Sequence, residues 1–214
     1  MSSHTPMGSM RTNLRMKGNS MKRITMAAVT IAAVSGLVLA GCSNAGNDTS
    51  SIAANASYNA ADVEFAQSMI PHHQQAVMMS QMAESAASTK RVRTLAGEIE
   101  AAQAPEIKQM RAWWAEWNVE ETDAGGHMAM GHGSDGMDMP GMMSTEQMSD
   151  LDSAKGSAFD EMFLTMMIEH HEGAVDMANA VKADGKDTDV RKLADAIIKG
   201  QTAEIATMTG WLSA

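Results

Sequence analysis

Two segments of the chain combine histidine and methionine with the same spacing. In each, one methionine lies three residues before a His-His pair and another lies six residues after it; the residues are Met69, His72, His73 and Met79, and Met167, His170, His171 and Met177. On a helix this spacing places sulfur and imidazole on adjacent turns. Imidazole combined with thioether suits copper, Cu(I) above all. We therefore predict that these eight residues form one or two copper sites, with silver as an alternative ion.

The two segments belong to an internal repeat. Residues 62–114 align without a gap with residues 160–212, and 19 of the 53 pairs are identical. Most surface positions have diverged between the copies. The polar residues identical in both are Asp62, His72, His73, Arg93, Gln103 and Glu106, each with a counterpart 98 residues later. Such a repeat defines the structural unit, and the retained polar residues indicate a role other than solubility.

Each copy is predicted to form a hairpin of two helices. Core-type residues recur every three or four positions in the first helix, at Phe65, Met69, His72, Ala76, Met79 and Ala83. The same spacing continues in the second helix, at Val92, Leu95, Ile99, Ala102, Glu106, Met110, Trp113 and Trp117. This periodicity gives a helix one buried face. Because proline inside a helix costs about 3 kcal/mol or more, we expect a kink or a restart near Pro71.

The fold class follows from the four amphipathic helices. They bury their apolar faces most simply as a four-helix bundle. The link between the hairpins, residues 119–145, is rich in Met and Gly and is predicted to be structureless. We predict an all-α, ferritin-like four-helix bundle made of two repeated helical hairpins joined by a long crossover. A link of this length is also compatible with up-down-up-down connectivity.

Four further polar residues lie close to the predicted core. They are Gln103 and Glu106 in copy one and Gln201 and Glu204 in copy two. A buried carboxylate is costly unless it is paired. We therefore expect the glutamates to pair with the histidines and the four residues to surround the metal ligands. A hydrogen-bond network with a purely structural role is the alternative interpretation.

The link carries a second candidate metal-binding segment. Its candidate ligands are His127, Met128, Met130 and His132. Because Gly, Ser, Asp and Pro around them disfavour regular packing, these methionines are not explained as core residues. We predict that the segment collects Cu(I) or Ag(I). A low-complexity linker and a contact to a partner are the alternatives.

The first 41 residues are predicted to be an export signal. Five basic residues precede an uncharged apolar stretch that ends in Leu39-Ala40-Gly41-Cys42. This stretch is too short for a confident membrane span, and Met21 is an alternative start. Leu-Ala-Gly-Cys resembles the bacterial lipobox, which implies that Cys42 is lipidated and anchors the chain to the outer face of the cell membrane.

The predicted organisation after the signal is simple. Residues 42–59 form a flexible tether and residues 60–214 a single domain. Within it, repeat one covers residues 60–118, the Met-rich linker residues 119–145 and repeat two residues 146–214.

Composition excludes several classes of site and partner. A single Cys rules out an intramolecular disulfide or a thiolate cluster. Removal of residues 1–41 takes away five basic and no acidic residues, which leaves 11 basic and 26 acidic residues and a net charge of −15. This charge argues against nucleic acid as a partner and attracts cations. The predicted partners are a metal ion and, through Cys42, a membrane; a homodimer is also compatible with the sequence.

The repeated motif resembles that of domain-of-unknown-function family 305. The family pattern Met-Ile-x-His-His-x-x-Ala-Val-x-Met occurs at residues 69–79 and again at residues 167–177. The resemblance covers about residues 58–213. It implies a ferritin-like helical bundle of an exported bacterial protein. Some relatives are similar to periplasmic copper-binding and copper-resistance proteins, although the family as a whole has no settled activity.

We predict an extracytoplasmic copper-binding protein that acts as a buffer, scavenger or chaperone. A ferritin-like di-metal oxidase using Glu106, Glu204, His72 and His170 is one alternative, but the Glu-x-x-His pair typical of such sites is missing, which makes iron a poor candidate. A cell-surface interaction module without metal is the other. We do not predict an enzyme, because no nucleophile–base pair, phosphate-binding glycine loop or dinucleotide motif is recognised.

Overall fold

The computed structural model describes residues 52–53, 56–119 and 139–214. They belong to one compact unit, Asn47–Ala214. The predicted signal at residues 1–41, the lipidation site Cys42 and the linker candidates His127, Met128, Met130 and His132 lie outside the described residues. Their predicted roles therefore stay predictions.

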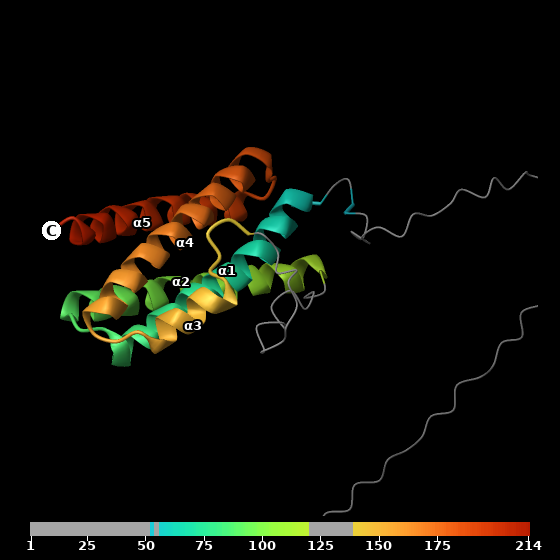
Figure 1. The fold of residues 1–214 in the computed structure, drawn as a ribbon. Coiled ribbons are helices and arrows are strands. Elements are labelled where there is room, and N and C mark those ends of the chain that lie inside the picture. Colours follow the sequence, from blue (N-terminus) through green and yellow to red (C-terminus); the bar gives the residue numbers. More distant parts are fainter. Residues whose placement is uncertain (1–51, 54–55, 120–138) are drawn as a thin grey trace, which may run out of the picture. The chain divides into compact units, whose positions relative to one another are not determined.

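The described residues form five helices and no strand (Figure 1). The helices are α1 (Ala60–Ala86), α2 (Lys90–Trp117), α3 (Thr145–Ser153), α4 (Ser157–Asp184) and α5 (Thr188–Leu212). α1 and α2 form one antiparallel hairpin, α4 and α5 form the other, and the hairpins meet where α1 packs on α4. The prediction of an all-α, ferritin-like helical bundle built from two hairpins is confirmed.

Most of the predicted buried faces are present. All six predicted core positions of α1, from Phe65 to Ala83, are buried. In α2, however, Ala102 is exposed and Gln103 takes its place in the core. Steps of three and four both fit a helical period of 3.6 residues, so the spacing alone does not decide between neighbouring positions.

Pro71 does not interrupt α1, contrary to our expectation of a kink or restart. The helix is continuous from Ala60 to Ala86, and Pro71 is buried within it. A helix that packs over most of its length tolerates one missing backbone hydrogen bond, because tertiary burial rather than local propensity supplies most of its stability. At its start, Asn59 and Asp62 form a reciprocal capping box.

The short helix α3 was not predicted. It lies in the region between the hairpins and begins with a capping box between Ser144 and Gln147. Leu151 is its one buried residue and joins the apolar cluster formed by residues of both hairpins. One anchoring side chain in nine residues gives too little periodicity for a prediction from sequence.

Two equivalent aspartates join the hairpins to each other. Asp160 of α4 accepts hydrogen bonds from the backbone N–H groups of Ser88 and Thr89, 2.8 and 3.0 Å long, and from the Ser88 hydroxyl, at the start of α2. Asp62 of α1 in turn accepts from the backbone N–H groups at the start of α5. Burial alone would raise the pKa of Asp160, but these hydrogen bonds outweigh it and hold the pKa below its ordinary value. The fold thus explains why both copies of the repeat have an aspartate at this position, Asp62 in one and Asp160 in the other.

We predict that Asp160→Ala lowers the free energy of unfolding by about 1–3 kcal/mol, because it leaves backbone donors of Ser88 and Thr89 without their acceptor. Urea denaturation of the purified mature domain measures the change. The matched control is Asp150→Ala on α3, where the side chain is exposed. Equal losses in both variants would contradict the role given to Asp160.

Candidate metal centre

The four predicted histidines lie where the two hairpins meet, and all four side chains are fully buried. The rings of His72 on α1 and His170 on α4 pack against each other, with centroids 3.7 Å apart and planes tilted by 38°. The ring of His171 lies 6.3 Å from that of His170. The fold thus brings together imidazoles from segments 98 residues apart.

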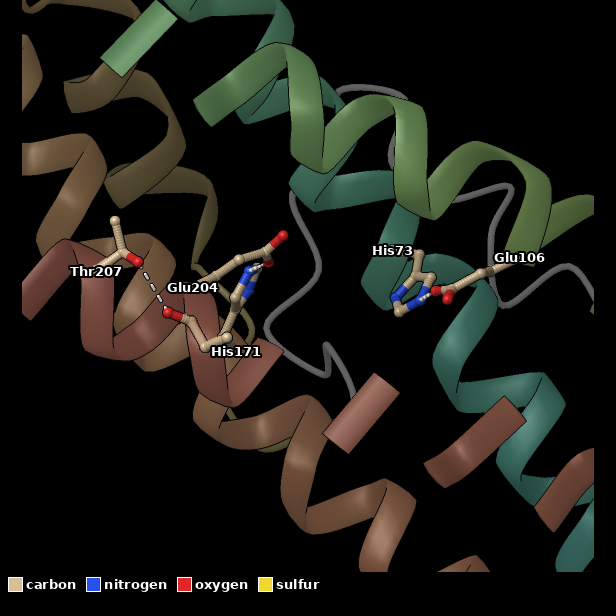
Figure 2. Close-up of polar contacts among 6 residues, drawn as sticks. His73, Glu106, His171, Glu204 and Thr207 are labelled. Carbon is tan, nitrogen blue, oxygen red and sulfur yellow. Dashed lines mark hydrogen bonds and ion pairs between the residues drawn. The ribbon is translucent and has the colours of Figure 1, made fainter. Parts of the chain in front are cut away.

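The second histidine of each pair is bound to a glutamate of the same hairpin. Nε2 of His73 lies 2.7 Å from Oε2 of Glu106, and Nε2 of His171 lies 2.6 Å from Oε2 of Glu204 (Figure 2). We expected the glutamates on core positions. Their side chains are instead 21% and 23% exposed, at the edge of the interior. The imidazole is therefore the buried member of each pair and the carboxylate connects it to the surface.

These hydrogen bonds fix which ring nitrogen carries the proton. A carboxylate accepts, so Nε2 of His73 and of His171 donates, and in the neutral form of each ring Nδ1 carries the lone pair. His72 donates from Nε2 to the backbone carbonyl of Pro140, at 3.0 Å, with the same result. A metal-ligating histidine commonly donates its other N–H to a carboxylate or a carbonyl in this way.

Five imidazole nitrogens in the described interior have no hydrogen-bond partner. They are Nδ1 of His72, His73 and His171 and both ring nitrogens of His170. Buried polar atoms in native proteins are almost always paired. These five nitrogens are therefore candidate donors to a bound ligand.

The central rings are neutral at physiological pH. Burial, followed by the neighbouring His73, lowers the pKa of His72 to about 3, although the Pro140 carbonyl opposes this shift. Burial, followed by His72, His171 and His73, holds the pKa of His170 well below its ordinary value, although a contact with the His72 backbone opposes the shift. Neutral imidazole is the form that binds metals, so no proton has to leave these rings first.

The predicted methionines flank the imidazoles on both sides. Met69, Met79 and Met167 are fully buried and Met177 is partly buried. Met79 and Met167 belong to one apolar cluster, whereas Met69 and Met177 belong to the other. Among the described residues no three His, Cys, Asp or Glu side chains form a ready set of metal ligands. An ion held here would therefore use thioether sulfur or require small side-chain movements.

No hydrogen bond joins the two predicted glutamines to the histidines. Gln103 and Gln201 are buried, but neither amide oxygen has a hydrogen-bond partner, and the Gln103 nitrogen has none either. Pro140, whose contribution is a backbone carbonyl, was not predicted. A carbonyl leaves no mark in the residue type, so no sequence signal could have identified it.

A groove of about 490 Å³ reaches one of the histidine–glutamate pairs from outside. It lies between the N-terminal part of α2 and the C-terminal part of α5, and Glu204 and Glu98 are among its lining residues. The guanidinium of Arg91 lies 5.2 Å from the centre of the Trp211 ring in the same groove. A cation entering here would meet a carboxylate that is bonded directly to the buried ring of His171.

No helix among the described residues has both the length and the apolar character that crossing a bilayer requires.

The fold and the site define a helical protein of two hairpins with an imidazole cluster between them. The family model "Domain of unknown function (DUF305)" matches residues 62–212. The chain therefore belongs to the DUF305 family, which confirms the resemblance of its repeated motif.

Several solved structures are similar to this chain. A DUF305 protein of Streptomyces coelicolor, described as a candidate secreted protein, is 31% identical, with a TM-score of 0.63 over 72% of this chain and 92% of that one. CopM in a Cu(II)-bound form is 34% identical, with a TM-score of 0.59 over 71% and 95%. A DUF305 fragment from Deinococcus radiodurans is 28% identical, with a TM-score of 0.63 over 72% and 97%. No curated protein matches the chain.

We predict that the metal-free domain loses stability as the pH falls from about 6.5 towards 3. In that range the unfolded chain binds protons at His72 and His170 while the folded chain does not, so unfolding takes up protons. Each ring contributes a slope of up to about 1.4 kcal/mol per pH unit. Urea denaturation between pH 6.5 and 5, in the presence of a chelator, measures the slope. An unchanged slope in His72→Gln/His170→Gln would contradict the assignment.

Proposed function

We propose that the protein binds copper, preferentially Cu(I), outside the cytoplasm, as a lipid-anchored buffer, scavenger or chaperone. The observation that carries the proposal is the set of five buried imidazole nitrogens without partners. Leaving a buried polar atom unpaired costs roughly 1–3 kcal/mol. A bound ion that accepts several of these lone pairs would offset that cost.

The ligand types favour a soft ion. The interior offers neutral imidazoles and the buried thioethers of Met69, Met79 and Met167. Such ligands suit Cu(I), and Ag(I) by the same chemistry. The carboxylates of Glu106 and Glu204 are engaged with His73 and His171 at the edge of the site, which suits a role in orienting ligands more than one in binding iron.

Relatives support metal binding in general. CopM, 32–34% identical to this chain, has been solved with Cu(II), Cu(I) and Ag bound. Export is supported by the lipobox-like Leu39–Cys42 segment and by the description of the Streptomyces coelicolor relative. A mature domain of net charge −15 would also raise the local concentration of cations.

The decisive experiment is Cu(I) titration of the purified mature domain against a calibrated chelator. We expect tight uptake, and a loss of affinity of about tenfold or more in His170→Gln and in His171→Gln. Ser80→Ala is the matched control, because Ser80 is buried on α1 and its hydroxyl also lacks a partner. Replacing His127, Met128, Met130 and His132 by serine should remove only weakly bound copper.

Three results would contradict this proposal in different ways. No uptake by the wild-type domain would exclude copper binding altogether. Histidine variants that lose stability but keep full copper affinity would favour the metal-free interaction module. Iron-dependent oxygen consumption by the reconstituted domain, without tight Cu(I) binding, would favour the oxidase.

We predict that Cys42→Ser releases the protein from the cell membrane. Without the thiol, no lipid can be attached at the start of the predicted mature chain, and the remaining described helices offer no membrane span. Phase partitioning of cell extracts into detergent measures the anchor, with wild type expected in the detergent phase and the variant in the aqueous phase. A variant that still partitions with detergent would contradict lipidation at Cys42.

A further inference from the structure

The segment Met139–Met143, which we call the strap, lies against both hairpins at the histidine cluster. On the α1 side, the amide of Gln75 holds its end through two hydrogen bonds. Nε2 of Gln75 donates to the carbonyl of Met143 over 2.8 Å, and the N–H of Met143 donates to Oε1 of Gln75 over 2.7 Å. Met143 is itself buried in the core. The strap is therefore fixed to the bundle at its Met143 end.

On the α4 side, the strap packs directly against the helix backbone. A Cβ atom on Gly173 would lie 1.9 Å from the carbonyl oxygen of Pro140, so only glycine leaves room for the strap. Gly141 has a φ of +76°, and a Cβ there would lie 2.5 Å from the carbonyl oxygen of Glu169. Both glycines are thus required by close contact between the strap and α4.

The two anchors occupy the same position of the internal repeat. Gln75 and Gly173 are counterparts 98 residues apart, yet one provides an amide and the other provides empty space. The histidines two and three positions before them are identical in both copies. One strap meets both copies of the repeat, and the residues that receive it differ between the copies.

The strap also makes the two central rings unequal. The carbonyl of Pro140 accepts a hydrogen bond from Nε2 of His72, whereas the equivalent His170 has no partner on either nitrogen. His72 can therefore offer only Nδ1 to a ligand while the strap is in place. His170 can offer either nitrogen.

We propose that Pro140 is a positioning residue of the central site: the strap, held by Gln75 and Gly173, fixes His72 in its Nε2–H tautomer and presents Nδ1 for ion binding. The effect on Cu(I) binding rests on the proposed function. The tautomer itself is a property of the metal-free protein. Loss of an orienting hydrogen bond behind a metal-binding histidine typically costs about 10–100-fold in affinity.

The test displaces the strap without altering any candidate ligand. In Gly173→Ala the new methyl group would occupy the place of the Pro140 carbonyl, and in Gln75→Ala both hydrogen bonds to Met143 are lost. Gly97→Ala is the matched control, because it is the same change within α2 where a Cβ would meet nothing within 4 Å. Two independent anchors keep the test informative if one variant does not fold.

The first measurement is the ¹⁵N spectrum of the imidazoles in the metal-free domain. We expect His72 in the Nε2–H form in wild type and in Gly97→Ala, and a mixture of tautomers in the two strap variants. The second is Cu(I) competition, in which we expect about a tenfold or greater loss of affinity in the strap variants only. A merely structural strap would lower stability without moving the tautomer.

Two outcomes overturn the inference. One is an Nε2–H tautomer at His72 that survives displacement of the strap. The other is a changed tautomer with unchanged Cu(I) affinity. If wild type binds no Cu(I), the proposed function fails and the assignment of Pro140 to ion binding fails with it, whereas a spectral change confined to the strap variants would still show that the strap sets the tautomer.

Discussion

The rings of His72 and His170 pack against each other at 3.7 Å in the middle of the contact between α1 and α4. Such a contact removes two imidazoles from water without giving either a side-chain partner. Apolar clusters lie on both sides of these rings. His73 and His171 are hydrogen-bonded to glutamates at the edge of the interior, and the Pro140 carbonyl of the strap accepts a hydrogen bond from His72. These surroundings keep the two central rings neutral and oriented. This arrangement supports the proposed binding of a ligand that accepts nitrogen lone pairs.

The repeat explains both the symmetry of this arrangement and its limits. Asp62 and Asp160 each bind the turn of the opposite hairpin, and each histidine–glutamate pair bridges the two helices of one hairpin. The strap is the exception, because one segment of chain serves a centre shared by two copies. The strap fits because the two copies differ at this position: Gln75 forms hydrogen bonds with it, and Gly173 leaves room for it. The proposed site between the two copies of the hairpin is thus asymmetric.

Much of this could be predicted because helical periodicity and a gap-free repeat can both be read directly from the sequence. They predicted the hairpins and the core face of α1, and they singled out the four histidines that the fold buries. Periodicity could not decide between Ala102 and Gln103, or whether His72 or His73 meets Glu106, because these depend on the register of one helix against another. The Pro140 carbonyl and α3 were missed, since a backbone group and a helix with one buried side chain leave no pattern.

The central claim is that the buried imidazoles hold a soft metal ion. Its most direct test is a crystal structure of the Cu(I)-loaded mature protein, with anomalous diffraction measured at the copper absorption edge. The account predicts an anomalous peak in the bundle interior, within bonding distance of Nδ1 of at least one histidine of the cluster and of a methionine sulfur. Copper found only on the surface, with the four rings unchanged around an empty centre, would contradict it.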